Sequence, residues 1–306
     1  MRSILNKLYI FIKKMVPFKK EIKYFILKKI NKKYYPVILK RMYKKRTGKK
    51  LNLENPVTFN EKIQWSKLYD VTPLKTQLAD KYLVREWVKE KIGEEYLIPL
   101  LGVWDKFDDI DFDKLPDQFV LKANHGSGWN IIVTDKKQFN RVEAKKKFDR
   151  WLNTNFAYLT LEMQYEDIKP KIIAEKYIVN ENNDLPDYKF FCFDGKVFCL
   201  YTMINYTFDH SKGQLGFFDR DYKLMPYHRG EYAPIKEQLP KPKNFEKMVE
   251  LAEILSKGFK HVRVDFYNLN GKIFFGEMTF TTSGGFAVFV PEEFDLLLGK
   301  QWNLIS

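Results

Sequence analysis

Two stretches of the sequence combine residue types that suit phosphate chemistry. In the first, an apolar run ends in Lys122 and is followed by a short loop that contains His125, Gly126, Ser127 and Gly128. A glycine-rich turn lets backbone N–H groups approach phosphate oxygens, and a lysine beside it supplies a countercharge. A strand rather than a helix is expected after the loop, and GxxxxGK[ST] is absent, which excludes a Walker A loop. A plain hairpin turn is the alternative.

The second stretch, 261–280, is a predicted hairpin that carries two carboxylates. A three-residue loop at 269–271 would pair position 265 with 275 and position 263 with 277. One face would then hold Arg263, Asp265, Glu277 and Thr279. The other face would be the core, formed by Val262, Val264, Phe266, Phe274, Met278 and Phe280. Two carboxylates suit a hard cation such as Mg²⁺.

Two alternatives remain for this hairpin. Its polar face could be a solvated surface with an Arg–carboxylate pair. A two-residue turn at Asn270-Gly271 would instead shift the register and separate the carboxylates.

The order of these patterns resembles that of ATP-grasp enzymes over about residues 75–290. Asp80-Lys81 is similar to the family's lysine-bearing helix, and Lys122 with its loop to the family's glycine-rich hairpin. The strand at 175–178 is similar to the one that meets adenine, and the hairpin at 263–279 to the one that binds metal. One position departs, because most members have Asn where this chain has Thr279.

The resemblance implies that the chain binds ATP and Mg²⁺. Lys81 and Lys122 would hold the phosphates, and the loop around Ser127 would close over them. The adenine edge would meet Glu175, Lys176, Tyr177 and Ile178, largely through backbone. Asp187 would take the ribose.

The same resemblance implies roles in metal binding and catalysis. Asp265 and Glu277, with Thr279 as an uncertain third ligand, would bind Mg²⁺. Arg263 would stabilise the oxyanion that develops at an acyl phosphate, and Lys189 would contact phosphate or acyl phosphate. His125 would contact phosphate or act as a base, and its alternative role is a hydrogen-bonding cap in the loop.

Five segments, including NPVTFNEKIQWSKLYD and FVLKANHGSGWNIIV, closely resemble the TupA-like branch of ATP-grasp proteins, named for teichuronopeptide biosynthesis. This implies an ATP-dependent carboxylate–amine ligase that joins an amino acid to a uronic acid carboxylate of a capsular or teichuronic-type polysaccharide. A glycosyltransferase and a saccharide kinase remain as alternatives. The glycosyltransferase would need an Asp-x-Asp motif, which Asp109, Asp111 and Asp113 spell twice.

The elements that must position these residues indicate an α+β protein with antiparallel hairpins. The capping-box pair Thr58 and Glu61 predicts a helix from Phe59 to about Leu68. Further helices are expected over 76–91, 141–153 and 244–257, among eight short apolar runs that predict strands. With the resemblance, this gives an ATP-grasp fold in which two α+β subdomains clamp ATP: a helical lead-in at 51–75, a lid subdomain at 76–170 and a metal-binding subdomain at 171–306.

The formal charge of +14 is confined to the N-terminus. Residues 1–50 hold 18 Lys or Arg and one acid, whereas the other 256 residues hold 35 basic and 38 acidic side chains. Apolar residues recur there at helical spacing, which predicts a basic helical arm. We expect residues 1–45 to bind an anionic membrane surface rather than nucleic acid. A helix packed on its own domain and an RNA-binding arm are the alternatives.

The chain contains only two cysteines, Cys192 and Cys199, which flank a predicted two-residue turn at Asp194-Gly195. Two cysteines make no disulfide scaffold and no zinc site, so buried free thiols in a reducing compartment are expected. No run approaches the roughly 20 apolar residues that span a bilayer. Together with the basic arm, this predicts a cytoplasmic protein bound to the inner face of the membrane.

Overall fold

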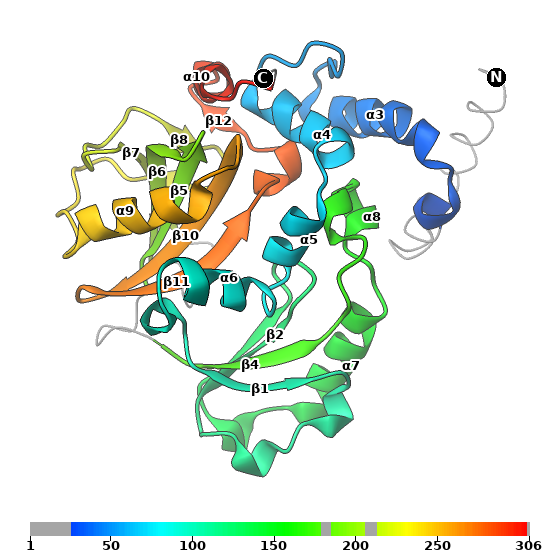
Figure 1. Ribbon diagram of the computed structural model, residues 1–306, viewed down its shortest axis with the longest axis vertical. Coiled ribbons are helices and arrows are strands. Elements are labelled where there is room, and N and C mark those ends of the chain that lie inside the picture. Colours follow the sequence, from blue (N-terminus) through cyan, green and yellow to red (C-terminus); the bar gives the residue numbers. More distant parts are fainter. Residues whose placement is uncertain (1–25, 179–184, 206–212, 305–306) are drawn as a thin grey trace.

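The computed structural model describes residues 26–178, 185–205 and 213–304, and two sheets dominate it (Figure 1). The four-stranded sheet has the order β1-β4-β2-β3 and is antiparallel throughout. Its strands are β1 (Leu100–Trp104), β2 (Phe119–Ala123), β3 (Asn130–Val133) and β4 (Ile172–Lys176). Because β4 completes this sheet, the chain passes to the second sheet only after Lys176, a few residues beyond the expected boundary at 170.

The six-stranded sheet has the order β11-β10-β5-β6-β7-β9, and only its β7–β9 pair is parallel among the described strands. Its strands are β5 (Asp187–Phe193), β6 (Lys196–Ile204), β7 (Gln214–Asp219), β9 (Ala233–Pro234), β10 (His261–Leu269) and β11 (Lys272–Thr279). A short pair, β8 (His228–Arg229) and β12 (Phe289–Val290), lies beside it. All eight apolar runs expected to be strands contain one, and the α+β class is confirmed.

The expected helices are present except over 76–91, and α8 and α10 are additional. The capping box of Thr58 and Glu61 is present and starts α4. The helices are α3 (Tyr35–Thr47), α4 (Phe59–Tyr69), α5 (Pro73–Ala79), α6 (Val84–Lys91), α7 (Arg141–Leu152), α8 (Ala157–Thr160), α9 (Phe245–Ser256) and α10 (Glu293–Gln301). Single 3₁₀ turns cover Lys32–Tyr34, Glu94–Tyr96, Phe107–Asp109, Phe112–Lys114, Lys136–Gln138, Met163–Tyr165 and Thr282–Gly285.

The single helix expected over 76–91 is wrong, because Asp80 divides it into α5 and α6. The Asp80 carboxylate accepts hydrogen bonds from the backbone N–H groups of Tyr82 at 2.8 Å and Leu83 at 3.2 Å. A side chain that bonds to nearby backbone in this way competes with the helix. Lys81 therefore sits in a turn between two helices.

The six-stranded sheet buries its two faces differently. One face packs against α6 and α9, through Val84, Val88, Met248 and Leu255 among others. Part of the other face packs against α4 and α10, with Phe59, Phe191 and Phe294 in the shared core. The four-stranded sheet packs one face against α7. The polar ends of β5, β10 and β11 lie on the face that α4 and α10 cover only in part.

The register of the β10–β11 hairpin differs from the expected one. Leu269 pairs with Lys272, so the turn has two residues, Asn270 and Gly271, and the expected three-residue loop is wrong. Both turn residues have positive φ, at 52° and 99°, as a tight hairpin turn requires. On its own this turn would place position 277 opposite position 264, on the core face.

A β-bulge restores the polar face. Asp265 pairs with Glu277 while Phe266 pairs with Phe275, so Gly276 is an extra residue in β11. The expectation that the four polar side chains share a face is confirmed, and Phe275 rather than Phe274 joins the core of that hairpin.

The described part of the N-terminal region packs against the rest of the protein. Residues 1–25, with most of the expected amphipathic pattern, lie outside the described residues. In α3, Tyr35, Leu39 and Tyr43 are buried in a core shared with Leu53 and Tyr158. Between residues 26 and 50, the chain is therefore a docked basic helix rather than a free arm.

The prediction of buried free thiols is confirmed. Cys192 and Cys199 are buried free thiols, and Cys192 pairs with Val197 across the two-residue turn at Asp194-Gly195. No helix among the described residues is long and apolar enough to cross a membrane.

Candidate active site

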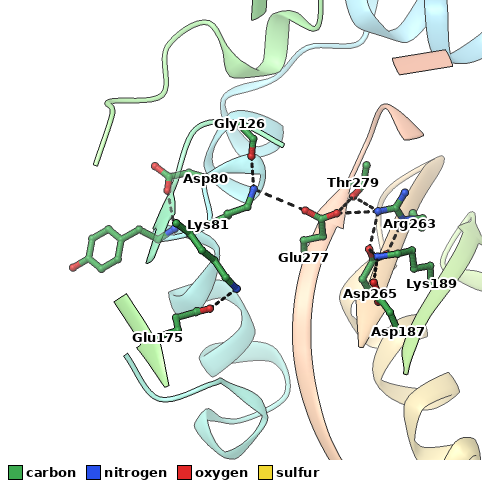
Figure 2. A network of polar contacts seen from close by, with 12 residues as sticks. Asp80, Lys81, Gly126, Glu175, Asp187, Lys189, Arg263, Asp265, Glu277 and Thr279 are labelled. Carbon is green, nitrogen blue, oxygen red and sulfur yellow. Dashed lines mark hydrogen bonds and ion pairs between the residues drawn. The ribbon is translucent and has the colours of Figure 1, made fainter. Parts of the chain in front are cut away.

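A row of charged side chains crosses three neighbouring strands of the six-stranded sheet (Figure 2). Asp187 and Lys189 lie on β5, Arg263 and Asp265 on β10, and Glu277 and Thr279 on β11. The pairing of residue 189 with 265, and of 265 with 277, sets the members side by side. We call these six residues, together with Lys81, the site network.

Arg263 is the centre of the site network. Its Nε and Nη2 donate to both carboxylate oxygens of Asp265, each at 2.7 Å. Nη2 also donates to Glu277 Oε1 at 2.9 Å and to the Thr279 hydroxyl at 3.0 Å. Burial alone would lower the pKa of Arg263, but Asp265 and the neighbouring groups raise it well above its usual value. Arg263 therefore remains a cation in contact with both predicted metal-binding carboxylates.

Lys189 joins the other end of the row. Its Nζ lies 2.5 Å from Asp187 Oδ2 and 2.7 Å from Asp265 Oδ2. Burial would lower the pKa of Lys189, but the two carboxylates raise it well above its usual value. Burial raises the pKa of Asp187 to about 6, although Lys189 opposes this rise, and Asp187 Oδ1 has no hydrogen-bond partner in the structure. Asp187 thus has an oxygen available for a ligand hydroxyl.

Lys81 connects this row to the glycine-rich loop. Its Nζ donates to the Gly126 carbonyl at 2.5 Å and lies 3.9 Å from Glu277 Oε2. The broken helix makes this reach possible, since the backbone N–H of Lys81 is held by the Asn124 carbonyl at 3.1 Å. Burial would raise the pKa of Glu277, yet Lys81, Arg263 and Lys189 lower it to about 2.

A second group of charges faces the row from the four-stranded sheet. Lys122 Nζ donates to Glu175 Oε2 at 2.6 Å, and Arg85 Nη1 donates to Glu175 Oε1 at 3.1 Å. Lys81 and Gly276 line the same small cavity as these three side chains. The structure thus places both phosphate-binding lysines expected from the sequence between the two sheets. Sequence reasoning missed Arg85, although its position four residues after Lys81 was a usable signal.

The expected adenine segment lines a pocket of about 100 Å³ beside Lys122. Glu175, Lys176, Tyr177 and Ile178 contribute to one wall, and Tyr267 of β10 contributes from the other sheet. Burial, then Asp187, raises the pKa of Tyr267 to about 12, so the phenol stays neutral. Sequence reasoning missed Tyr267, although the alternation of side chains from Arg263 through Asp265 predicts that it lies on the polar face.

The glycine-rich loop forms a tight connection between β2 and β3. Gly128 has a φ of 71°, and a Cβ at Gly126 would lie 2.4 Å from the Trp129 ring, so both positions require glycine. Ser127 is exposed at the tip.

His125 lies beneath this loop rather than at its surface. Its Nδ1 lies 3.2 Å from Asn124 Oδ1 and its Nε2 lies 3.0 Å from the Trp151 carbonyl. Burial lowers the pKa of His125, and the ring is 1% exposed. A neutral ring has one N–H and both neighbouring atoms are acceptors, so one nitrogen donates to a protein group, as in the hydrogen-bonding cap that the sequence left as the alternative.

The donor set of the hairpin suits Mg²⁺. Asp265 and Glu277 lie directly opposite each other and Thr279 adds a hydroxyl on the same face, so all candidate donors are oxygens. No group of three or more His, Cys, Asp or Glu with metal-binding geometry occurs among the described residues. A cation held here would therefore need part of its coordination from a ligand such as phosphate.

Comparisons with known proteins identify a family. A family model described as TupA-like ATPgrasp matches residues 61–303. No curated protein matches the sequence.

Similar solved structures include two D-alanine–D-alanine ligases and an ATP-grasp ligase. The Bacillus anthracis ligase complexed with ATP is 18% identical, with a TM-score of 0.41, over 67% of this chain and 55% of that one. The Helicobacter pylori ligase is 12% identical, with a TM-score of 0.41, over 80% and 69%. The ATP-grasp ligase PsnB, complexed with a precursor variant, Mg and ADP, is 10% identical, with a TM-score of 0.40, over 79% and 66%. The chain thus spans about half the length of the first of these relatives.

Proposed function

Because the chain belongs to the TupA-like ATP-grasp family, we propose that it is an ATP-dependent carboxylate–amine ligase. Family membership agrees with the resemblance and the ATP-grasp fold expected from the sequence. The observation that carries the proposal is the placement of Lys81 and Lys122 between the two sheets, opposite a row of paired acids and cations. Lysines and arginines that converge on one cavity suit a polyphosphate whose γ-phosphoryl group is transferred.

The proposed reaction has two steps. A substrate carboxylate oxygen attacks the γ-phosphorus of ATP, the bond to the β,γ-bridging oxygen breaks, and an acyl phosphate and ADP form. An amine then attacks the acyl carbon, inorganic phosphate leaves with the C–O bonding pair, and the amine loses a proton as the amide forms. No enzyme nucleophile is needed, because phosphate is the leaving group in the second step.

This chain's residues would share the work as follows. Lys81 and Lys122 orient the phosphates, and the pocket around Tyr177 and Tyr267 holds the adenine ring. Arg263 faces the oxyanion that develops when the amine attacks, and Lys189 faces the acyl phosphate. Asp265, Glu277 and Thr279 would hold Mg²⁺, which supplies charge neutralisation at the phosphates.

We propose, finally, that the carboxylate belongs to a uronic acid of a capsular or teichuronic-type polysaccharide and that the amine belongs to an amino acid. This specific substrate pair rests on the family resemblance of the sequence. An acidic saccharide is compatible with a site whose cations outnumber its acids: Lys81, Arg85, Lys122, Lys189 and Arg263 against Glu175, Asp187, Asp265 and Glu277.

Of the two rival functions, the glycosyltransferase fits less well. A glycosyltransferase would use an Asp-x-Asp motif, but all three aspartates are exposed: Asp109 and Asp113 lie in 3₁₀ turns, and Asp111 caps the second turn by accepting from the backbone N–H of Asp113. A saccharide kinase would use the same nucleotide site and would omit the amine step.

Turnover of ATP by the purified protein tests these functions. The protein is supplied with Mg²⁺, a panel of amino acids and oligosaccharides that contain uronic acids, and ADP, phosphate and product mass are measured. A ligase releases ADP and phosphate in equal amounts and gives an amide-mass product. A phosphorylated saccharide formed without amine would identify a kinase, and release of nucleoside diphosphate from a sugar nucleotide would contradict both.

We also propose that the basic N-terminal region holds the enzyme at the anionic inner face of the cytoplasmic membrane. Residues 1–25 hold seven Lys or Arg and one acid, and each cation near an anionic surface contributes about 1 kcal/mol. Removal of residues 1–25 is the clean test, because a longer deletion would remove the buried Tyr35 and Leu39. The deletion should weaken binding to phosphatidylserine vesicles about 1,000-fold or more and leave turnover of a water-soluble substrate intact. Equal vesicle binding by the two forms would contradict this location.

A further inference from the structure

The oxygens expected to bind the metal are already engaged by cations of the protein. Both oxygens of Asp265 accept from Arg263 at 2.7 Å, and Oδ2 also accepts from Lys189 at 2.7 Å. Glu277 Oε1 accepts from Arg263 at 2.9 Å and from the Thr279 hydroxyl at 3.2 Å. Glu277 Oε2 faces Lys81 at 3.9 Å (Figure 2). Three of the four carboxylate oxygens thus hold direct charge-assisted hydrogen bonds.

Burial makes these contacts strong obstacles to a second cation. The side chains of Arg263 and Asp265 are 7% and 2% exposed. In such a site, a divalent cation would lie next to the Arg263 guanidinium with little water to screen the repulsion between the two positive charges. The network is also balanced, since Lys81, Lys189 and Arg263 offset Asp187, Asp265 and Glu277. A divalent cation alone would break this balance.

An anionic nucleotide would reverse the situation. Lys81 donates its hydrogen bond to the uncharged Gly126 carbonyl, and its ion pair with Glu277 is long at 3.9 Å. Lys81 can therefore turn toward a phosphate without breaking a close contact with a carboxylate. Arg263 uses one nitrogen, Nη2, for contacts with Asp265, Glu277 and Thr279 together. Phosphate oxygens that entered between the sheets would offer both cations new partners of the kind they bind best.

We propose that Arg263 and Lys81 guard the metal site, so that the free protein does not bind a divalent cation and nucleotide binding opens the site. Phosphate oxygens take over the guanidinium and the ammonium group, and the freed oxygens of Asp265 and Glu277 then become available for metal coordination. This inference rests on the proposed ATP-dependent function, and it adds an order of binding that the function itself does not require.

Equilibrium dialysis of Mn²⁺, used in place of Mg²⁺, tests the inference without turnover. The full-length protein is treated with chelator and dialysed against Mn²⁺, with and without a non-hydrolysable ATP analogue, and retained metal and retained nucleotide are both measured. Free metal–nucleotide complex equalises across the membrane, so the excess in the protein chamber is bound to protein. We expect Mn²⁺ to bind at least about 100-fold more weakly without the analogue than with it.

The variant Arg263→Gln should gain nucleotide-independent Mn²⁺ binding, with the ratio falling below about tenfold, since the guarding charge is gone. Lys81→Met, which alters no strand of the sheet, should show a smaller gain and serves if Arg263→Gln does not fold. Arg220→Gln removes a guanidinium that pairs with Glu253 instead, and is the matched control that should behave as the wild type.

Equal Mn²⁺ retention with and without the analogue, or no gain in either variant, would overturn the guarding role and leave the ligase proposal standing. Failure of the wild-type protein to retain the analogue under any condition would overturn the proposed function itself.

Discussion

Two buried polar clusters lie near the end of β11, and their cations contact different partners. In the site network, Arg263 and Lys189 contact carboxylates. In the neighbouring cluster, the fully buried Lys67 donates to backbone carbonyls: that of Thr160 at 3.2 Å and that of Gly284. It also donates to Gln64 Oε1 at 3.0 Å. We call this second group the Lys67 cluster.

The two clusters also differ in their pKa shifts. Burial lowers the pKa of Lys67 to about 7 although Glu162 opposes this shift, and the Glu162 oxygens accept hydrogen bonds from the hydroxyls of Thr160 and Thr281. The pKa of Lys189 rises well above its usual value because two carboxylates outweigh burial. A cation with a carboxylate partner can exchange it for phosphate, whereas a cation such as Lys67, which has no ion pair among the described residues, fixes the loops whose carbonyls it contacts. The first arrangement suits function and the second suits structure.

Asp265→Asn should give the largest effect. The substitution keeps the shape of the side chain but removes the charge that faces both Arg263 and the expected metal. We expect kcat/KM for ATP to fall about 1,000-fold or more, as measured by ADP release. The fold should persist, because Arg263 keeps Glu277 and Lys189 keeps Asp187.

Circular dichroism and denaturation of the Asp265→Asn protein serve as the control for folding. Turnover within tenfold of the wild type would show that the site network is a structural salt-bridge cluster, and the contrast with Lys67 would disappear.

Lys67→Met should have the opposite profile. The methionine fills the space but leaves the Thr160 carbonyl and Gln64 Oε1 without a donor, and the Gly284 carbonyl keeps only its hydrogen bond from Gln64 Nε2. Buried acceptors without partners cost stability, so we expect a loss of about 3 kcal/mol in the free energy of unfolding, measured by urea denaturation. The kcat/KM of the folded fraction should change less than tenfold.

Lys45→Met, on the exposed side of α3, is the matched control and should leave stability within about 0.5 kcal/mol. If Lys67→Met lost activity without losing stability, Lys67 would belong with the functional cluster.

Sequence reasoning located most residues of the site network because strand alternation is short-range. Four polar side chains alternate along two adjacent strands: Arg263, Asp265, Glu277 and Thr279. A hairpin places such side chains on one face whenever its register pairs odd-numbered positions with odd-numbered positions. The Lys67 cluster could not be predicted, since nothing in the sequence of α4 distinguishes Lys67 from an ordinary surface lysine. Its partners come from residues 160 and 284, far away in the chain, and only tertiary structure brings them together.

Gly276→Ala should damage the functional cluster by a smaller amount, through the bulge. A Cβ at this position would lie 3.1 Å from the Asp265 carbonyl oxygen, so β10 or β11 must shift by a few tenths of an ångström. Because the bulge aligns Glu277 with Asp265, we expect kcat/KM to fall about tenfold, which is about 1.4 kcal/mol in transition-state stabilisation. Lys272→Ala, at the exposed start of the same strand, is the control.

Normal kinetics for Gly276→Ala would mean that the carboxylate alignment tolerates such a shift. The bulge itself shows a limit of sequence reasoning. Either turn length was compatible with the sequence, and the expected three-residue loop gave the right face for the wrong reason. The true two-residue turn needs the extra residue at Gly276 to compensate for it.

The same limit applies to the helix expected over 76–91 and to the basic arm. The apolar periodicity continues through the turn at Asp80 and does not mark the break between α5 and α6. The break is explained only by the Asp80 carboxylate, which competes with the helix for backbone N–H groups. In the arm, the charge count was correct, but the whole of residues 1–45 was expected to bind a membrane surface. Tyr35, Leu39 and Tyr43 instead pack on the body, because a periodic apolar stripe does not specify what covers it.

His261 is a buried group that stays uncharged, unlike the cations of the two clusters. Its substitution gives the smallest expected effect. Its Nδ1 donates to the Cys192 carbonyl at 3.0 Å, its Nε2 has no partner, and its ring packs between Phe193 and Trp302. Burial lowers the pKa of His261 to about 3, with only a weak opposing contribution from the Cys192 hydrogen bond.

The sign of the pH dependence follows from that pKa. The unfolded chain takes up a proton near the ordinary pKa of about 6.5, and the folded chain does so only near 3, so acidification between these values favours unfolding. Each pH unit in that window costs up to about 1.4 kcal/mol, so wild type should lose about 1 kcal/mol more than His261→Phe between pH 7 and pH 5.5. Urea denaturation at the two pH values measures this difference. Equal losses of stability in the two proteins would mean that His261 accepts a proton in the folded state. A buried ring in this sheet could then hold an unpaired charge, whereas the charges of the site network are paired.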